Sequence, residues 1–179
     1  MLRKLLILSF LLTTSIVFAQ KKKDKRYPQA AAPAKLDPNI NYRELGSPLP
    51  PFVVKTLDKK QITDADVKND ANFFLMLFNP TCDHCEKQTD SLRENFSLFK
   101  KSKLLLVATP PMIGYLPYFI DDHKLKDYPE IMLGTDSALT ARTFIYMSLP
   151  QINIYDKDRK LIRIFSGNVA IDSLKQYIQ

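Results

Sequence analysis

The sequence predicts an α/β fold with a central mixed sheet, and three observations carry this prediction. Residues 73–78 and 104–108 are apolar at successive positions, which is typical of strands covered on both faces of a sheet. The segment between them, residues 86–101, has helical periodicity, so strand, helix and strand follow one another as in a parallel crossover. Residues 151–155 alternate in polarity and pair with residues 161–165 as a hairpin, which adds an antiparallel end to the sheet.

The remaining elements follow from turn, capping and periodicity patterns. Residues 52–57 are strand-like and end in a turn at 58–60. Thr63 and Asp66 have the form of a capping box, which predicts a short helix. Pro117 is expected to interrupt a partly helical region. We expect that helical region at 110–127, a short strand at 131–133, a helix at 137–146 and a closing amphipathic helix at 171–178.

The N-terminus has the pattern of an export signal. Arg3 and Lys4 precede an apolar run over residues 5–18, and Val17 and Ala19 suit the −3 and −1 positions of a cleavage site. The run is short for a full membrane span, and an uncleaved anchor stays an alternative. We expect a signal peptide over 1–19, a disordered basic and Pro/Ala-rich linker over 20–44 and one domain over 45–179, in a periplasmic or otherwise exported bacterial protein.

The basic excess of the chain is local, and this argues against nucleic-acid binding. The whole chain carries +7, but residues 21–26 hold +4 of it, and Arg3 and Lys4 leave with the signal. From Asn41 onward 18 basic residues accompany 17 acidic ones, so the domain is nearly neutral. Such a basic tail is typical of a solvated linker and can also make a weak contact with anionic lipid. A monomer is expected.

The chain has two cysteines, Cys82 and Cys85, which lie where the buried strand ends and the helix begins. A thiol at a helix N-terminus meets unpaired backbone N–H groups and the positive end of the helix dipole, which favour its thiolate. The thiolate is the nucleophile in disulfide exchange, and a second thiol three residues on can close the ring and release the product. A structural disulfide of this spacing would close only a tiny loop and contribute little stability, so we interpret the pair as redox-active.

Other chemistries for these cysteines are weaker. Zinc needs four ligands, whereas two thiols with His84 or His123 are all that the chain offers. Copper(I) accepts two thiolates, so a periplasmic copper carrier stays an alternative. Neither cysteine follows the proline and threonine of the peroxidase pattern PxxxTxxC, and Glu86 stands where a c-type haem site needs histidine. We therefore expect no cofactor and no metal, and we interpret His123 as a solvated helix-end residue.

Taken together, these features resemble the thioredoxin fold, and in particular the exported TlpA/ResA-type thiol–disulfide oxidoreductases. Residues 46–52 are similar to the family's entry into its N-terminal β-hairpin, and residues 73–85 to its central strand with the redox motif. Leu149-Pro150 before a hairpin is similar to the family's cis-proline site, and Gly167 to the glycine before its last helix. The likeness covers residues 45–179, with residues 110–134 as the helical insertion that precedes the cis-proline.

The resemblance implies that the protein exchanges disulfides with protein cysteines. Cys82 would be the exposed attacking cysteine and Cys85 the buried resolving one. Pro150 would be cis and lie against this pair, since an X-Pro bond is where a cis peptide costs least. Leu149 would offer backbone N–H and C=O groups to an extended partner segment, with Thr81 and Pro150 as further contacts. The implied partners are cysteine-containing exported proteins and an upstream thiol–disulfide partner.

Three positions depart from the family's pattern. Thr81 stands where the family usually has tryptophan, and the chain has no tryptophan at all. Met76 replaces the buried acid of thioredoxins proper, and Gln88 replaces the acid that ResA-like members have after the second cysteine. The usual proton acceptor for the resolving thiol is therefore missing at both places, and Asp83, Glu86 or a water molecule stay open as substitutes.

The two residues between the cysteines have opposite effects on the redox potential. His84 takes the place of the thioredoxin proline, and an imidazole there favours the Cys82 thiolate, which makes the disulfide more oxidising. Asp83 opposes that thiolate through its negative charge. The sequence therefore leaves the redox direction open.

A redox-inactive binding module with the same fold is a further alternative. Apolar and aromatic side chains of the inserted region, among them Tyr115, Leu116, Tyr118 and Phe119, could build a partner surface. We interpret them instead as core residues of the inserted helix.

Overall fold

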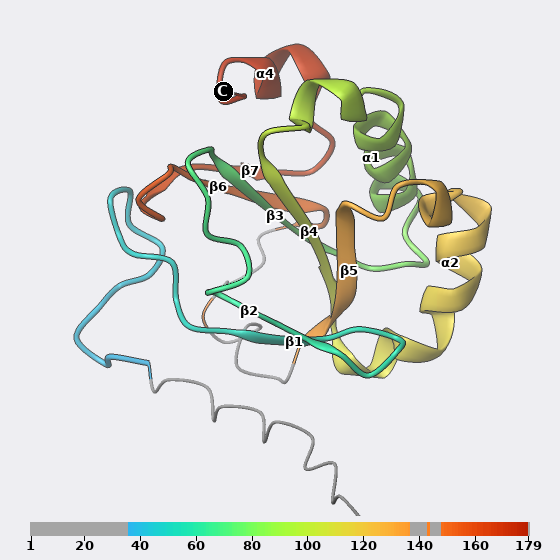
Figure 1. The fold of residues 1–179 in the computed structure, drawn as a ribbon, viewed down its shortest axis with the longest axis horizontal. Coiled ribbons are helices and arrows are strands. Elements are labelled where there is room, and N and C mark those ends of the chain that lie inside the picture. Colours follow the sequence, from blue (N-terminus) through green and yellow to red (C-terminus); the bar gives the residue numbers. More distant parts are fainter. Residues whose placement is uncertain (1–35, 137–142, 144–147, 179) are drawn as a thin grey trace, which may run out of the picture. The chain divides into compact units, whose positions relative to one another are not determined.

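The computed structural model describes residues 36–178, with the exception of 137–142 and 144–147. Its strands form one seven-stranded mixed sheet in the order β2-β1-β5-β4-β3-β6-β7 (Figure 1). The expected signal peptide, most of the expected linker and the expected helix at 137–146, apart from Thr143, lie outside the described residues. The strands are β1 (Val53–Lys55), β2 (Gln61–Thr63), β3 (Phe73–Phe78), β4 (Lys103–Ala108), β5 (Ile131–Asp136), β6 (Gln151–Tyr155) and β7 (Leu161–Ser166).

Strand β3 lies at the centre of this sheet because all six of its residues are apolar and buried. It pairs in parallel with β4, where Met76 lies opposite Leu106, and antiparallel with β6, where Met76 lies opposite Ile152. The predicted α/β class is confirmed, as are the N-terminal hairpin of β1 and β2 and the C-terminal hairpin of β6 and β7. This pairing directs the carboxyl end of β3 toward the segment that carries the cysteines.

The helices of the described chain cover one face of the sheet with apolar side chains. Alternate residues of β3, among them Phe74 and Met76, pack there against Leu92, Phe119 and Leu174 of three different helices. Figure 1 shows these three helices, α1, α2 and α4, along the same side of the strands. The helical elements are α1 (Asp83–Glu94), η1 (Phe96–Phe99), η2 (Pro110–Tyr115), α2 (Leu116–Asp122), η3 (Leu125–Asp127) and α4 (Ile171–Lys175).

The other alternation of β3 builds a second core on the opposite face. Phe73 stacks between Phe52 and Tyr155, with ring centroids 6.4 and 5.9 Å away. Leu75 and Leu77 belong to the same cluster. Because a strand sends successive side chains to opposite faces, one apolar run supplies both cores.

The structure corrects the predictions of a helix after Thr63 and of a helix interrupted at Pro117. Thr63 and Asp66 form the hydrogen bonds of a capping box, since the Asp66 carboxylate accepts from the Thr63 backbone N–H at 2.7 Å and from its hydroxyl at 2.8 Å. No helix follows, since residues 64–67 form turns, and the guanidinium of Arg159 donates to the backbone oxygens of Val67 and Ala71. Pro117 lies in the first turn of α2, where proline needs no N–H partner, so it begins a helix rather than interrupting one.

The helix predicted over 86–101 is two elements. Asn95 ends α1, with its amide side chain donating to the Ser91 oxygen at 2.9 Å, and the chain continues into η1. The closing helix is also shorter than predicted, since α4 ends at Lys175. Among the described residues, no helix combines the length and the apolar character needed to cross a bilayer.

The segment before β1 is attached to the edge of the sheet by backbone hydrogen bonds. Gly46 N–H donates to the Leu161 oxygen at 2.7 Å, and Leu161 N–H donates to the Ser47 oxygen at 2.8 Å. Gly46 adopts a φ of 87°, which glycine accepts without steric cost. The preceding residues 36–44 form turns in which Tyr42 is 9% exposed, so the chain already packs before residue 45.

Candidate active site

Both cysteines lie at the junction between β3 and α1, as the sequence predicts. The turn that joins these elements is held by Asn79, whose side-chain oxygen accepts from the Thr81 N–H at 3.0 Å and from the Thr81 hydroxyl at 2.9 Å. Cys82 is the N-cap residue of α1, and its carbonyl accepts the Cys85 N–H at 2.8 Å and the Glu86 N–H at 3.0 Å. An asparagine directly after a buried strand is a typical turn residue, and the sequence indicates a chain break at 79–81, but not these side-chain hydrogen bonds of Asn79.

The two thiols differ sharply in exposure. Cys82 is half-buried at the surface, whereas Cys85 is 0% exposed and belongs to the core under the helices. Burial raises the pKa of Cys85 from 9.0 to about 12, because the thiolate would lose its hydration. The Asn79 N–H, 3.4 Å from the Cys85 sulfur, lowers this pKa, whereas hydrogen bonding to Cys82 and the charges of Cys82 and Glu86 raise it further.

Leu149 and Pro150 form the second part of the site. The peptide bond between them is cis, as the resemblance implied. Leu149 packs against the core cluster that contains Cys85 and that Cys82 also contacts, so the structure brings the cis-proline segment and the cysteine pair to the same core. Pro150 is buried, and its carbonyl accepts the Gly167 N–H at 2.8 Å. Gly167 itself has a φ of 80°, which allows β7 to turn back toward this segment.

Asp83 and His84, which the sequence singles out as redox-tuning residues, are both exposed in the first turn of α1. The Nδ1 atom of His84 lies 3.4 Å from the amide nitrogen of Asn168, in the segment between β7 and α4. An amide N–H that donates there requires Nδ1 to be the unprotonated ring nitrogen. Asn168 is therefore a polar neighbour of the motif that sequence reasoning did not find, because 84 positions separate the two residues.

The two positions where relatives have acids hold no carboxylate here and are both buried. Met76 is 0% exposed and Gln88 is 2% exposed. The side-chain oxygen of Gln88 accepts the Val169 N–H at 2.7 Å, so this residue connects α1 to the segment before α4. Of the carboxylates that the sequence left open, Glu86 is the one whose charge acts on the Cys85 thiol.

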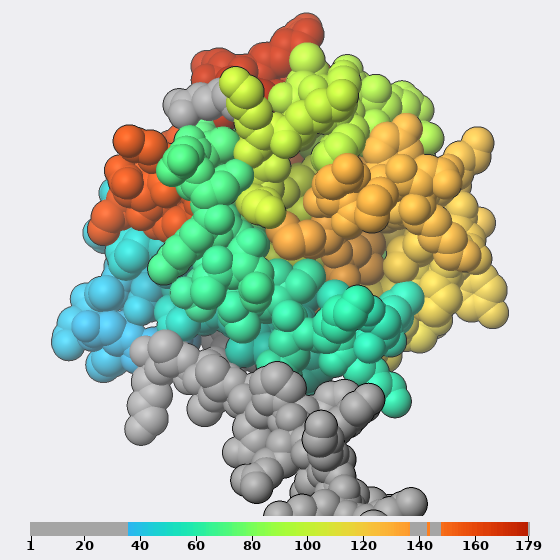
Figure 2. Space-filling view, viewed as in Figure 1, coloured from blue at the N-terminus to red at the C-terminus, as the bar shows by residue number. Residues whose placement is uncertain are grey.

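A groove of about 490 Å³ lies directly beside the redox motif. One wall is the motif segment itself and the other is the inserted region η2–α2, and we call this feature the redox groove. Figure 2 shows the inserted region, coloured gold, at the surface beside the orange β5. The lining residues are Pro80, Thr81, Glu86, Tyr115, Tyr118, Phe119, Asp122 and His123.

The prediction that the apolar and aromatic residues of the inserted region are core is right for Leu116 and Phe119 and wrong for Tyr115 and Tyr118. Leu116 and Phe119 are 0% and 3% exposed, and Phe119 packs against Phe78 with ring centroids 4.8 Å apart. Tyr115 and Tyr118 are 52% and 73% exposed. Helical spacing explains the difference, since residues 116 and 119 share the face of α2 that meets the sheet and residue 118 points away from it.

The interpretation of His123 as a solvated residue is wrong. Its side chain is buried and lines the redox groove, and its Nδ1 lies 2.9 Å from a carboxylate oxygen of Asp90. The imidazole also packs against the Phe119 ring, with centroids 4.4 Å apart. Asp90 binds Arg93 as well, at 3.0 Å, so its charge is shared between two internal partners. These contacts join α2 to α1, and nothing in the local sequence around residue 123 indicates them.

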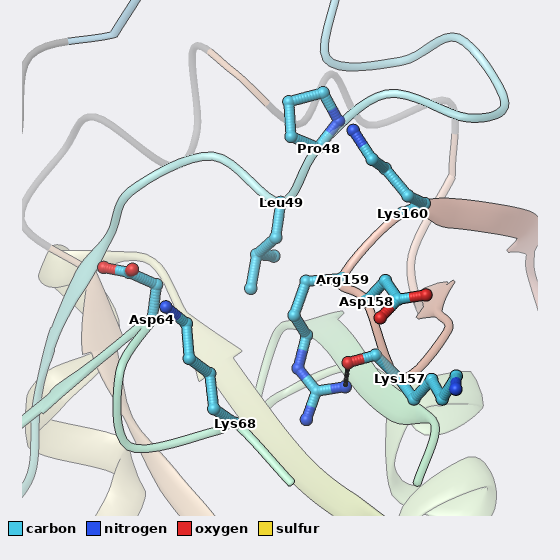
Figure 3. Close-up of a pocket in the computed structure, with 8 residues that line it drawn as sticks. All are labelled: Pro48, Leu49, Asp64, Lys68, Lys157, Asp158, Arg159 and Lys160. Carbon is cyan, nitrogen blue, oxygen red and sulfur yellow. Dashed lines mark hydrogen bonds between the residues drawn. The ribbon is translucent and has the colours of Figure 1, made fainter. Parts of the chain in front are cut away.

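A second cavity, of about 390 Å³, lies at the other end of the sheet, near the β6–β7 turn (Figure 3). Leu49 points into it, and Lys68, Lys157 and Lys160 surround it. Its buried guanidinium, that of Arg159, donates to backbone oxygens of Val67, Ala71 and Asp156 and to the side chain of Asn69. The hydrogen bonds of this guanidinium hold the 67–71 loop to the β6–β7 turn.

In the described part of the chain, no group of three or more His, Cys, Asp and Glu side chains could hold a metal ion. A metal at Cys82 and Cys85 would therefore have two protein ligands, which suits copper(I) alone among the metals considered.

Comparison with known proteins agrees with this geometry. No family model matches the chain. The thiol-disulfide oxidoreductase ResA of Bacillus thuringiensis subsp. konkukian is 26% identical over 138 residues, which cover 76% of this chain and 78% of the relative. ResA of Bacillus cereus strain ATCC 10987 matches with the same identity and coverage.

Solved structures share the fold at lower sequence identity. StoA from Bacillus subtilis aligns with a TM-score of 0.60 and 16% identity, over 75% of this chain and 99% of that one. The thioredoxin domain of a Bacteroides vulgatus thiol-disulfide oxidoreductase aligns with a TM-score of 0.63 and 14% identity, over 76% and 99% of the two chains. A secreted Mycobacterium tuberculosis disulfide oxidoreductase, homologous to DsbE of E. coli, aligns with a TM-score of 0.59 and 17% identity, over 71% and 93%.

Proposed function

The chain is a thioredoxin-fold thiol–disulfide oxidoreductase of the TlpA/ResA type, and on this premise we propose that Cys82 and Cys85 are its redox pair. The observation that supports this assignment best is the unequal exposure of two thiols at one strand–helix junction. Cys82 is accessible to a partner, whereas Cys85 is sealed behind it in the core. The substrates are cysteine-containing proteins, as the class of enzyme implies.

As a reductant, the protein transfers two electrons in two exchange steps. The Cys82 thiolate attacks one sulfur of the partner disulfide, and the other partner sulfur leaves with the electron pair and takes up a proton. Cys85 then gives up its proton and attacks the Cys82 sulfur, which breaks the mixed disulfide and releases the second partner thiol. The partner has gained two electrons and two protons, and the Cys82–Cys85 dithiol has lost them. As an oxidant, the protein runs the same steps in reverse.

The second step needs a base, because burial raises the pKa of Cys85 to about 12. In this proposal Glu86 takes that proton. It is half-buried one residue after Cys85, and its negative charge contributes to the raised pKa of the thiol. Gln88 cannot take the proton, since an amide is not a base at neutral pH.

The partner contacts in this proposal are Thr81, Leu149 and Pro150. Thr81 is exposed beside the attacking thiol, and Leu149 is half-buried at the cis bond. An extended partner segment laid between them would present its disulfide to Cys82 and pair with the backbone of Leu149.

Asp83 and His84 set the redox potential of the pair in this proposal, through opposite effects on the Cys82 thiolate. We further propose that the protein acts outside the cytoplasm, with residues 1–19 as its export signal. The compartment suits the chemistry, because disulfides persist where the surroundings are oxidising.

Two single substitutions test the mechanism. Cys82→Ser removes the attacking thiol, and we expect it to lower the exchange rate with a peptide disulfide by about a thousandfold or more, as loss of the nucleophile does. Cys85→Ser keeps the nucleophile but not the resolving thiol, so it should accumulate a mixed disulfide with the peptide, visible as an added mass that dithiothreitol removes. Lys157→Ala, at the other end of the sheet, is the matched control and should exchange at the rate of the unaltered protein. Normal turnover by Cys85→Ser would overturn the two-thiol mechanism.

A further inference from the structure

The redox groove has properties that disulfide exchange alone does not require. It is continuous with the motif, since Thr81 in its wall is the residue next to Cys82. Its opposite wall exposes Tyr115 and Tyr118, which are 52% and 73% exposed, and Ile113 of the same inserted region is 48% exposed. Large apolar side chains rarely remain exposed together without a partner, so this wall is a candidate contact surface.

The charges in the redox groove have one sign. Glu86 on α1 and Asp122 at the end of α2 both line it, and no lysine or arginine does. Within the part of the chain that the structure describes, neither of these carboxylates forms an ion pair. Asp90 does not line the groove, and it differs from these two carboxylates because it pairs with His123 and Arg93. The groove therefore presents two uncompensated negative charges beside two exposed tyrosine rings.

This combination matches one kind of side chain. A lysine or arginine of a partner can place its apolar stem and its charge against a tyrosine face while the charged end meets a carboxylate. A glutamate or aspartate in the same place would be repelled by both carboxylates. Because the groove begins at Thr81, a side chain held in it belongs to a residue only a few positions from the cysteine that Cys82 attacks.

We infer that the redox groove selects partner proteins that carry a lysine or arginine close to their reactive cysteine, an inference that rests on the proposed exchange function. In this inference Asp122 and Tyr118 are specificity-determining residues, and the cysteine pair supplies the chemistry. Asp122 lies on the far wall of the groove and is the sharper probe, since Glu86 also acts on the Cys85 thiol.

The test uses oxidised peptides that differ only in the residues flanking the cysteine, which are lysine, serine or glutamate. Reduced full-length protein is mixed with each peptide at low salt, and the rate of peptide reduction is followed by acid quenching and mass spectrometry. Each rate is divided by the rate of the same peptide with dithiothreitol, which removes the effect of the flanking charge on the peptide's own disulfide. We expect the normalised rate of reduction to be about tenfold higher for the lysine peptide than for the glutamate peptide. This is the size of effect expected for charge complementarity in a partly exposed groove.

Variants then assign the preference to the redox groove. Asp122→Asn should reduce the lysine-to-glutamate ratio about threefold, and Asp122→Lys should abolish or invert it. Tyr118→Ala should also reduce the ratio. Asp121→Asn is the matched control, because Asp121 is the adjacent residue of α2, pairs with Lys126 and does not line the groove. Raising the salt concentration should reduce the ratio for the unaltered protein, since exposed charges are screened.

Each outcome has a defined meaning. Equal normalised rates for the three peptides with the unaltered protein would overturn the inference and leave the proposed function intact. The same loss of preference in Asp121→Asn as in Asp122→Asn would also overturn it. A dimer in analytical ultracentrifugation that Tyr118→Ala dissociates would assign the groove to a second copy of the chain and overturn it as well. Failure to reduce any peptide would remove the proposed function, and with it this inference.

Discussion

The two ends of the sheet both carry a cavity with charged side chains, and they use those charges in opposite ways. At the β6–β7 turn, Arg159 is 6% exposed and donates from its guanidinium to carbonyls of the 67–71 loop and of its own turn. In the redox groove, Glu86 and Asp122 line an open cavity and have no ion-pair partner among the described residues. A buried charge must be satisfied from within the fold, whereas an exposed one is free to meet a partner.

This difference distinguishes the two cavities more clearly than their size does. The two cavities measure about 390 and 490 Å³, so volume does not distinguish them. The two cavities are distinguished instead by whether their charged groups have partners within the fold. At one end the Arg159 guanidinium binds backbone oxygens of the fold, and at the other two carboxylates line an open groove beside the half-buried Cys82.

The largest effect should come from removing the structural charge. Arg159→Ala removes the donors to Val67, Ala71 and Asn69 and leaves buried carbonyls unpaired, so we expect a loss of about 3 kcal/mol in the free energy of unfolding. Urea unfolding followed by circular dichroism measures it.

A second substitution separates the effect of the lost hydrogen bonds from the effect of the backbone conformation at residue 159. Arg159 has a φ of 59°, a conformation that glycine accepts more readily than alanine. Arg159→Gly should therefore be slightly less destabilised than Arg159→Ala. In both variants the ratio between lysine and glutamate peptides should be unchanged. A loss below about 1 kcal/mol in Arg159→Ala would show that the two ends of the sheet are less different than proposed.

A smaller effect concerns the pH dependence of stability. Burial raises the pKa of Cys85 from 9.0 to about 12, so the unfolded chain releases this proton at lower pH than the folded protein does. The contribution of the buried thiol to stability is therefore complete below pH 9.0 and falls as the pH rises toward 12. By about pH 10.5 the loss should reach about 2 kcal/mol.

The measurement compares the reduced protein with Cys85→Ala by urea unfolding at several pH values. Other groups titrate equally in both proteins, so the difference between the two curves reports on the thiol. Parallel curves over this range would mean that Cys85 is not protected from ionisation, and the contrast between an accessible and a sealed thiol would fail.

The smallest effect is expected on the other side of the motif. The amide nitrogen of Asn168 lies 3.4 Å from Nδ1 of His84, in an exposed contact. Because the contact is long and exposed, Asn168→Ala should move the redox potential of the pair by no more than about 10 mV. Redox titration against glutathione measures the potential, with Lys87→Ala, an exposed neighbour, as the control. A shift of about 30 mV or more would contradict this expectation.

The sequence was a good guide wherever local pattern decides the structure. The apolar run of β3, the helical stripe that carries Cys85 and Leu92, and the alternation in β6 and β7 all lie where predicted. The cis bond before Pro150 was predicted from the resemblance and is confirmed. These features depend on neighbours in the chain or on a motif of a few residues, so they can be read without the fold.

The errors come from contacts between residues far apart in the chain. The capping box at Thr63 and Asp66 forms, but no helix follows, and the next residues are held instead by Arg159, which lies 92 positions after Val67. The contact of His123 with Asp90 joins two helices, and the two residues lie 33 positions apart in the chain. A local pattern contains no record of such partners.

By itself, the sequence determined which thiols can react and where they lie relative to strand and helix, because apolar periodicity and the spacing of two cysteines are local properties. The tertiary structure alone decided which tyrosines stay exposed and which carboxylates remain without an ion-pair partner, whereas the burial of Cys85 was already implied by the resemblance. Exposure and pairing depend on what the fold brings alongside each side chain, and that is settled only when segments distant in the chain pack together.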